Sequence, residues 1–591
     1  MRIASRVVSK VVPTFLVGLA AVIAWSPGTR GDDPPKKGVE GTWKLVVLAY
    51  GTDEFAVVKL EEKDGKLTGT VPSVQKQVLG NDAEIAVDPA KPDSDAVAFT
   101  LKGQGGSSRF EGRLAKDGPA AGKVLGTFAF RGEPYPALLE RTTSDKVGAM
   151  SQSDMVKEYV AAAQGRDPKT KVAKLKESIR KHAGSPTLHL FYGALLEAAE
   201  DAGLAAEDVK QVVADWSREA EPYGAAWVNS VRQKALKAIG AHKPYASLAV
   251  ELAQKVDKEM GETATLEERA AVVGLLARAA TLAGKADIAK EAADRSAKLE
   301  AQLDEEYHKK VPPFKTQPFQ GRKDGKADRV VLMELFTGAQ CPPCVAADVA
   351  FDGLLTTYKP TEFIGLQYHL HIPGPDPLTN EDSIARQQYY GTEVRGTPST
   401  FFNGHSQAGG GGPMGYSEGK YNEFKEIVEN QLEGARGASI KLSADRIGDV
   451  VNIAAEATLS KKSGAPAEKK DQDGDAAKSK PRLRLALTEE AIRYVGGNKL
   501  RYHHHVVRDF PGGVEGKDVS SGSGEVKVKL NLADLKREIE EYLSKSAKTR
   551  PFPNPLPEVE FKDLSVVAFV QDDADKKILG AVSVPVKLAN P

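Results

Sequence analysis

Only two cysteines occur in this chain of 591 residues, and both lie in one short motif, Cys341-Pro342-Pro343-Cys344. Two cysteines placed at random in a chain of this length would have that spacing in about 0.3% of cases. The count excludes a small fold held together by several disulfide bonds, and it excludes a zinc site built mainly from thiolates. The motif is therefore the strongest indication of a chemical function in the sequence.

Length and composition predict a multidomain globular protein. The chain has enough residues for about four domains of ordinary size. Hydrophobic residues make up 41% and charged residues 27%, so there is apolar material for cores and wholesale disorder is excluded. The 81 Lys and Arg balance the 81 Asp and Glu. This balance gives no reason to expect nucleic acid or an anionic membrane as a partner.

The amino terminus has the layout of a secretory signal. Three basic residues precede an apolar stretch from Val11 to Trp25, and a polar segment follows it. The stretch is short for a membrane span, and Pro13 interrupts it as a helix. We predict that residues 1–31 are a signal peptide, with Ala24 and Gly31 as possible cleavage points. The alternative is an uncleaved anchor. We expect export to the periplasm or the cell exterior, with no stable membrane insertion after cleavage.

The chain changes character several times, which predicts a sequence of domains. Residues 38–145 read as short strands with Gly punctuation, typical of a small all-β barrel or sandwich. Residues 151–310 have the spacing of helical hairpins and resemble tetratricopeptide repeats, although the full signature is absent. Residues 328–436 alternate strands and helices. Residues 437–591 return to strands, as in a β-sandwich, around a charged insert at 461–480 that we expect to be a disordered loop.

The cysteine pair lies where a strand is expected to meet a helix. Arg329–Phe336 has the apolar pattern of a buried strand, and Val345–Tyr358 reads as an amphipathic helix. The amino end of a helix offers unpaired backbone N–H groups and a positive dipole, which both favour a thiolate. Cys341 is then expected to attack a substrate disulfide, and Cys344 to resolve the mixed disulfide. The alternative is that the pair forms a structural disulfide.

This strand–CxxC–helix segment is followed by Thr397-Pro398 ahead of the strand-like Ser399–Phe402, and the combination resembles the thioredoxin fold. In that family the proline is cis and its loop receives the substrate backbone. The resemblance implies that Thr397 and Pro398 bind substrate and that Cys341 and Cys344 form a redox-active disulfide. It implies no bound cofactor, because electrons pass between dithiols.

Longer segments also resemble exported bacterial thioredoxin-like proteins whose function is poorly assigned. The similar segments are ELFTGAQCPPC, LQYHLHIPGPDPL, ARQQYYG and GTPSTFFNG. Downstream, YHHHVVRDFPGG and VVAFVQDDADKKILGA resemble the β domain that often follows such modules. The resemblance therefore extends over most of the second half of the chain.

Three positions depart from the thioredoxin pattern. Pro342 contributes no N–H to a neighbouring thiolate, and Gln340 replaces the aromatic residue before the first cysteine. Glu334 is the candidate for the buried acid of that family, displaced by one turn residue. If it is buried near Cys344, it can accept that thiol's proton. Otherwise Glu334 faces solvent or takes part in a structural pair.

Two pairs of histidines are further candidates for a site. His369 and His371 alternate on one predicted strand, as do His503 and His505, so each pair shares a face. The pairs lie in different predicted domains, without a carboxylate in evident ligand geometry. We therefore favour structural roles over metal binding. The glycine-rich stretch 403–412 lacks the GK[ST] ending of a phosphate loop.

We therefore expect an exported thiol–disulfide oxidoreductase. Its partners would be protein dithiol or disulfide clients and a redox partner. The alternative is a cell-envelope interaction protein whose thioredoxin-like module holds a structural disulfide.

Overall fold

The computed structural model divides the chain into two compact units, Met1–Leu299 and Glu300–Pro591, which we describe separately. The predicted signal peptide and nearly all of the charged insert at 461–480 lie outside the described residues. The structure describes residues 38–48, 53–80, 83–88, 95–103, 106–130, 133–149, 153–261, 264–323, 325–460, 479–554 and 556–589.

The first unit begins with an eight-stranded antiparallel sheet in the order β3-β2-β1-β8-β7-β6-β5-β4. The sheet curls until its terminal strands approach each other: a Cβ on Gly69 of β3 would lie 2.8 Å from the Val87 side chain of β4. Trp43, Phe99 and Phe110 are fully buried in its core. Of the two predicted forms, a small barrel or a sandwich, the structure shows a barrel-like sheet. The strands are β1 (Gly41–Val47), β2 (Asp53–Lys63), β3 (Lys66–Val74), β4 (Glu84–Val87), β5 (Ala96–Gly103), β6 (Gly106–Leu114), β7 (Val124–Phe130) and β8 (Glu133–Arg141).

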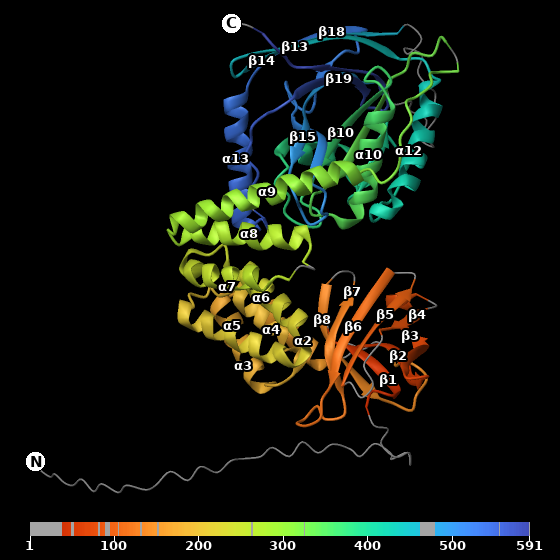
Figure 1. The fold of residues 1–591 in the computed structure, drawn as a ribbon. Coiled ribbons are helices and arrows are strands. Elements are labelled where there is room, and N and C mark those ends of the chain that lie inside the picture. The colour runs from red at the N-terminus through yellow and green to blue at the C-terminus, as the bar shows by residue number, and fades with distance from the viewer. Residues whose placement is uncertain are drawn as a thin grey trace, which may run out of the picture. The chain divides into compact units, whose positions relative to one another are not determined.

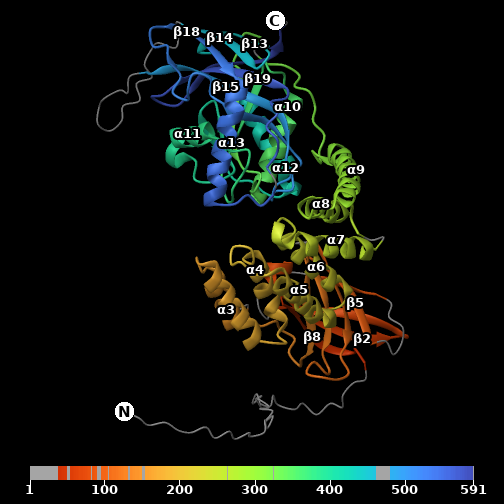
Figure 2. The same ribbon diagram turned by 90° about the vertical axis from the view of Figure 1, so that its left-hand side faces the viewer.

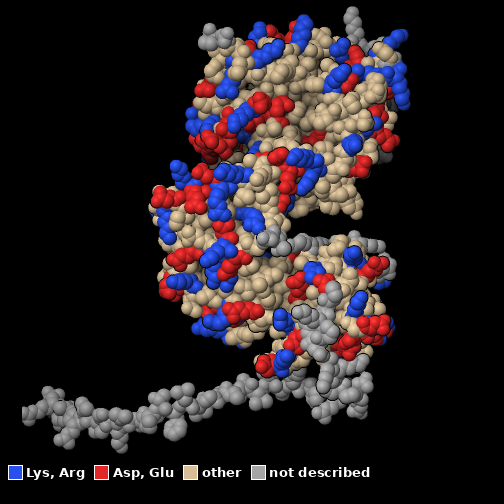
Figure 3. All heavy atoms as spheres, in the orientation of Figure 1, with Lys and Arg blue, Asp and Glu red and all other residues tan. Residues whose placement is uncertain are grey.

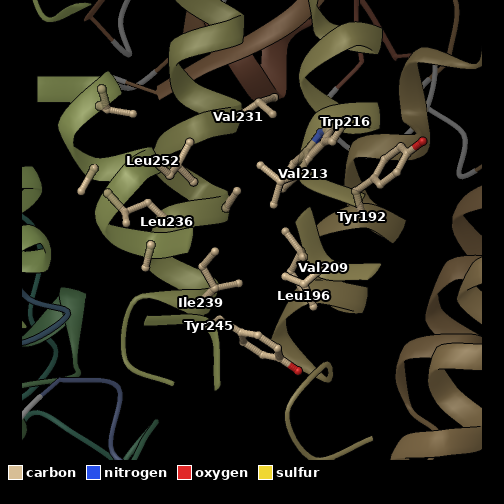
Figure 4. Packing of buried hydrophobic residues seen from close by; sticks show 14 of the residues in the cluster. Tyr192, Leu196, Val209, Val213, Trp216, Val231, Leu236, Ile239, Tyr245 and Leu252 are labelled. Carbon is tan, nitrogen blue, oxygen red and sulfur yellow. The ribbon is translucent and has the colours of Figure 1, made fainter. Parts of the chain in front are cut away.

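Helices follow the barrel-like sheet and share one apolar core. Figure 4 shows Tyr192, Trp216, Val231 and Leu252 directed into the space between neighbouring helices. The helix α8 begins with a capping box in which Thr265 and Glu268 satisfy each other's backbone N–H groups. The helices are α2 (Asp154–Ala163), α3 (Pro168–Lys181), α4 (His189–Glu197), α5 (Ala206–Ala220), α6 (Ala225–Ile239), α7 (Ala246–Glu259), α8 (Leu266–Leu282) and α9 (Ala286–Lys310).

The second unit is built on one long sheet with the order β12-β11-β9-β10-β16-β15-β19-β20. Strand β10 is parallel to β9 on one side and to β16 on the other, so strands from both sides of residue 437 belong to the same sheet (Figure 1). The strands are β9 (Val331–Thr337), β10 (Phe363–His369), β11 (Ser399–Phe402), β12 (His405–Ala408), β15 (Pro481–Arg493), β16 (Tyr502–Asp509), β19 (Leu564–Asp572) and β20 (Ile578–Pro585).

Helices cover the first half of this sheet on both faces. The helices α10 (Val345–Thr357) and α12 (Ser417–Leu432) pack together on one face, and α11 (Glu381–Tyr390) lies on the other (Figure 2). Successive side chains of a strand point to opposite faces. In β9, Leu335 therefore packs on the α10 side, whereas Phe336 packs on the α11 side.

A second, smaller sheet packs on the other half of the long sheet. Its order is β18-β14-β13-β21, and its apolar side chains share a core with β15, β19 and the helix α13 (Leu532–Thr549). The two layers form a sandwich whose larger sheet continues into the helix-covered half. The strands are β13 (Ala438–Ile447), β14 (Val450–Leu459), β18 (Ser523–Asn531) and β21 (Lys587–Leu588).

The surface in Figure 3 mixes Lys and Arg with Asp and Glu, as the balanced composition predicts. Within the described ranges, no helix combines the length and the apolar character needed to cross a bilayer.

Candidate functional site

The two cysteines form a disulfide bond at the junction of β9 and α10. The S–S distance is 2.11 Å and the Cα–Cα distance is 5.4 Å. Strand β9 ends at Thr337, the turn Gly338–Gln340 follows, and a short 3-10 turn, Pro342–Cys344, leads into α10. Cys341 is 1% exposed and Cys344 is 0% exposed. The pair therefore lies at the predicted strand–helix junction, but below the surface.

The backbone N–H groups at the start of α10 are already bonded. The N–H of Cys344 donates to the carbonyl of Cys341 at 3.0 Å, and the N–H of Ala346 donates to the carbonyl of Gly412 at 2.9 Å. The two prolines of the motif have no N–H to offer. The sequence-based expectation of unpaired N–H groups facing a thiolate is therefore wrong at these positions.

Thr397 supplies a polar donor to the first cysteine instead. Its hydroxyl lies 3.3 Å from Cys341 Sγ and 3.2 Å from the carbonyl oxygen of Ile372, so its single proton can be shared between these acceptors. The peptide bond between Thr397 and Pro398 is cis. The structure thus brings together four of the residues that the sequence singled out: the two cysteines, Thr397 and Pro398.

The glycine-rich loop after β12 closes against the same turn. The N–H of Gly412 donates to the carbonyl of Pro343 at 2.6 Å. A Cβ on Gly411 would lie 1.9 Å from the Pro343 oxygen and 2.8 Å from Cγ of Pro398. Only glycine allows this approach, so these residues serve close packing against the cysteine motif.

Glu334 lies on the opposite face of the sheet from the α10 core. Its carboxylate accepts hydrogen bonds from Arg386 Nε at 2.7 Å and Nη2 at 3.0 Å, and from the hydroxyl of Tyr390. Glu334 and Arg386 are both fully buried. Strand alternation sends Glu334 to the α11 side with Phe336. The structure therefore does not bring Glu334 to the cysteines, and it shows the structural pair that the sequence left open.

Asp348 is a buried acid on the same side as the cysteines. It lies one helical turn after Cys344 on α10 and is 2% exposed. Neither carboxyl oxygen completes a hydrogen bond, although the Thr337 hydroxyl lies close enough to interact. Burial raises the pKa of Asp348 well above 3.8; the Thr337 hydroxyl opposes this shift, and the negative charges of Asp352 and Asp376 add to it. The sequence-based predictions did not include Asp348. Its position four residues after Cys344, on a largely apolar helix, could have indicated it.

The side chain of Asp376 forms a hydrogen bond with the turn that precedes Cys341. Its Oδ2 accepts hydrogen bonds from the N–H of Ala339 at 2.5 Å and from the Nδ1 side of the His369 ring at 2.9 Å, and its Oδ1 accepts from the N–H of Leu378 at 2.8 Å. Burial acts to raise the pKa of Asp376, but His369 and the two N–H groups outweigh it and the net pKa is lowered. Asp376 is therefore a carboxylate that anchors the turn.

His369 and His503, one histidine of each pair, are neighbours, and both pairs lie in the unit Glu300–Pro591. The rings of His369 and His503 meet edge to face, with 4.8 Å between their centroids, because β10 and β16 are adjacent strands. Burial, and then His369, lowers the pKa of His503 to about 3, so His503 is neutral. His371 contacts the hydroxyl of Tyr542 at 3.0 Å. In the part of the chain that the structure describes, no group of three or more His, Cys, Asp or Glu could hold a metal ion.

Comparisons with known proteins add little to this geometry. No protein-family model and no curated protein matches the chain. Among solved structures, HBP35 of Porphyromonas gingivalis is similar, with a TM-score of 0.29 and 16% identity over 45% of this chain and 78% of that chain. A TM-score of this size supports no conclusion about fold or function.

Proposed function

We propose that this protein is an exported thiol–disulfide oxidoreductase with a thioredoxin-like module. The element order β9, α10, β10, α11, β11, β12, α12 and the sheet order β12-β11-β9-β10 are the orders expected of a thioredoxin-like module, which supports the proposal. The observation that carries the proposal is the Thr397 hydroxyl, 3.3 Å from Cys341 Sγ. A hydrogen bond to sulfur favours the thiolate, which is the attacking species in disulfide exchange.

The reaction is a two-electron exchange between two dithiols. The Cys341 thiolate of the reduced protein attacks a client disulfide, forms a mixed disulfide and releases one client thiolate. Cys344 then attacks Cys341 Sγ, which closes the protein disulfide and releases the second client thiolate. The client gains two electrons and the protein loses them. An external dithiol returns the electrons, and the same steps in reverse oxidise a client.

Asp348, in place of Glu334, is the acid that we assign to proton transfer at Cys344. Residues four apart on a helix lie on the same side, and both side chains are buried. Cys344 must lose its proton before it attacks Cys341, and it must gain one when the protein disulfide is reduced. The raised pKa means that Asp348 holds a proton more readily than an exposed carboxyl group, so it can return a proton to Cys344 when protonated and accept one when ionised.

Client proteins would meet uncharged, exposed groups around the disulfide. Pro342 and Pro343, which lie between the two buried cysteines in the chain, are exposed. Tyr416 is 68% exposed and its side chain packs against Gly412 of the glycine-rich loop. These groups suit an extended polypeptide segment that carries the client disulfide.

A trapping experiment tests the proposal. Cys344→Ser removes the resolving thiol, so an incubation with a disulfide-containing peptide should yield a mixed disulfide at Cys341 that dithiothreitol releases. Cys341→Ser is the matched control and should form none. The wild-type protein should also catalyse insulin reduction by dithiothreitol. A folded Cys344→Ser variant that forms no mixed disulfide, together with an inactive wild type, would refute the proposal.

One observation favours the alternative of a structural disulfide in a cell-envelope interaction protein. Both cysteines are buried, with Cys341 only 1% exposed. A structural disulfide typically has a reduction potential below about −300 mV. Equilibration with dithiothreitol, followed by alkylation and mass spectrometry of the cysteine peptide, separates the two functions.

Export has its own test, because it depends on residues 1–31. A secreted chain should begin after Ala24 or Gly31, which amino-terminal mass spectrometry of the mature protein determines. An intact Met1 on protein recovered from the cytoplasm would contradict export.

A further inference from the structure

The loop between β15 and β16, residues 494–498, lies against the turn that presents Cys341. The side chain of Gln340 links the two segments: its Oε1 accepts a hydrogen bond from the N–H of Gly497 at 2.9 Å, and its Nε2 donates to the Tyr494 hydroxyl at 3.3 Å. Gln340 occupies the position before the first cysteine. The presence of glutamine there, rather than an aromatic residue, is explained by its two partners on the loop.

Asn498 binds the backbone of the same turn. Its N–H donates to the carbonyl of Ala339 at 2.9 Å, and its Nδ2 donates to the carbonyl of Gly338 at 3.4 Å. Its Oδ1 accepts from the N–H of Leu500 at 3.0 Å, which holds the buried side chain in place. The Gly338 carbonyl also accepts from the N–H of Cys341 at 3.0 Å. Asn498 Nδ2 and the N–H of Cys341 therefore donate to the same carbonyl oxygen, that of Gly338.

Gly496 makes the close approach possible. A Cβ at this position would lie 2.2 Å from the carbonyl oxygen of Ala339 and 2.9 Å from the Ala339 Cβ. Real Cβ atoms are not found at such distances from backbone, so any other residue pushes the loop and the turn apart.

We propose that the 494–498 loop is a positioning element of the disulfide-exchange site. Each residue of the turn Gly338–Gln340 has a bond to this loop, and Asp376 holds the Ala339 N–H from the other side. The loop thereby keeps the Cys341 backbone where Sγ reaches both Cys344 and Thr397. This inference rests on the proposed function for its consequence in catalysis. It also gives the segment after residue 437 a direct part in the site.

The test is the equilibrium between the disulfide and dithiothreitol, measured on the full chain by alkylation and mass spectrometry. Gly496→Ala and Asn498→Ala loosen the turn, so the two thiols meet less often and the disulfide becomes less stable. We expect the equilibrium constant for reduction to rise about tenfold, which corresponds to about 30 mV for a two-electron couple.

Gly580→Ala is the matched control. Its Cβ would also meet backbone, at 2.4 Å from the Ala438 oxygen, but on β20 and away from the cysteine turn. This variant should keep the wild-type equilibrium constant even if its melting temperature falls. A general loss of stability is thereby separated from an effect on the cysteines.

The outcomes distinguish this inference from the proposed function. Wild-type equilibrium constants in folded Gly496→Ala and Asn498→Ala would overturn the positioning role. If Gly496→Ala does not fold, Asn498→Ala decides by the same measurement. If the equilibrium constants shift but the wild type exchanges with no client, the loop positions the disulfide and the oxidoreductase proposal fails.

Discussion

Two aspartates lie buried around the cysteine turn, and their surroundings shift their pKa values in opposite directions. Asp348 completes no hydrogen bond, and its pKa is raised by burial. Asp376 accepts bonds from two backbone N–H groups and from His369, and its net pKa is lowered. Both side chains are buried, so burial does not explain why their pKa values shift in opposite directions. The hydrogen-bond donors around each carboxyl group do.

Asp348→Asn should stabilise the protein at neutral pH. Between pH 3.8 and the raised pKa of Asp348, the folded chain holds a proton that the unfolded chain has lost. Stability therefore falls as pH rises through this window, by about 1.4 kcal/mol per pH unit. The asparagine variant has no carboxyl group to deprotonate, so its stability does not fall in this pH window. Hydrogen exchange of α10 should show a larger opening free energy than wild type at pH 7.5 and a similar one at pH 4. A smaller value at pH 7.5 would contradict the account.

Asp376→Asn should have the opposite effect. The lowered pKa of Asp376 contributes stability that is present above pH 3.8 and is lost as pH falls through the lower folded value. The amide cannot accept all three bonds, so donors remain unsatisfied at a cost of about 1–3 kcal/mol each. Thermal unfolding should show a large deficit at pH 7 that shrinks toward pH 3. An equal deficit at both pH values would exclude the charge as its cause.

Glu334→Gln separates the buried ion pair from the cysteine chemistry. Removing one partner of such a pair costs about 3–5 kcal/mol, because Arg386 remains buried and charged. The melting temperature should fall. The equilibrium of the disulfide with dithiothreitol should stay at the wild-type value, since Glu334 lies on the other face. A shift of that equilibrium would return Glu334 to the site.

At the residue scale, the sequence indicates those functional residues that stand in a recognisable local context along the chain. The two cysteines and Thr397-Pro398 stand in recognisable contexts, and the structure brings them together. Asp376 and Asn498 act through distant partners, Ala339 and Gly338. No spacing in the sequence indicates that such residues are neighbours.

At the scale of elements, α10 packs directly onto the strand beside it. A Cβ on Gly365 of β10 would lie 2.3 Å from Cζ of Phe351 in α10. Gly365→Ala should therefore push the helix away from the sheet and cost about 1–3 kcal/mol. Gly419→Ala in α12 is the control, because its Cβ has open space and alanine favours a helix by about 0.5–1 kcal/mol over glycine. The free energy of unfolding, measured by chemical unfolding followed by circular dichroism, should fall for Gly365→Ala and rise for Gly419→Ala. Equal changes in the two variants would contradict this packing.

The elements with clear periodicity were predicted well. The helix predicted at Val345–Tyr358 and the strand predicted at Arg329–Phe336 correspond to α10 and β9, with ends that differ by at most two residues. The helix α5 lies in the region 151–310 that was predicted to be helical, and its buried residues Val209, Val213 and Trp216 follow helical spacing. The strand β4 is four residues long, which is too short to show a reliable alternation.

At the scale of the whole molecule, the second unit depends on a sheet that both of its halves share. Phe336 and Leu366 from the first half pack in one core with Val507 and Phe569 from the second. A fragment of residues 328–436 would expose this core and leave β10 without its partner β16. A fragment of residues 286–591 retains the shared core and the pairing of β10 with β16.

We expect the fragment of residues 286–591 to unfold cooperatively and the fragment of residues 328–436 to remain unfolded or aggregate. The longer fragment also keeps α9, whose Glu300 and Asp304 form ion pairs with Arg493 and Arg501. Thermal unfolding followed by circular dichroism compares the two. A cooperative transition in the shorter fragment would show that its core does not need the later strands.

The sequence by itself determined the position of the cysteine pair between a strand and a helix, because hydrophobic periodicity and the CxxC spacing are local properties. Only the tertiary structure decided what surrounds that pair. The face that Glu334 takes, the neighbours of Asp348, the meeting of His369 with His503 and the contact of the 494–498 loop with the turn all depend on which strands become neighbours. The pairing of β10 with β16 brings residues more than a hundred positions apart into contact, and packing between distant segments selects that pairing.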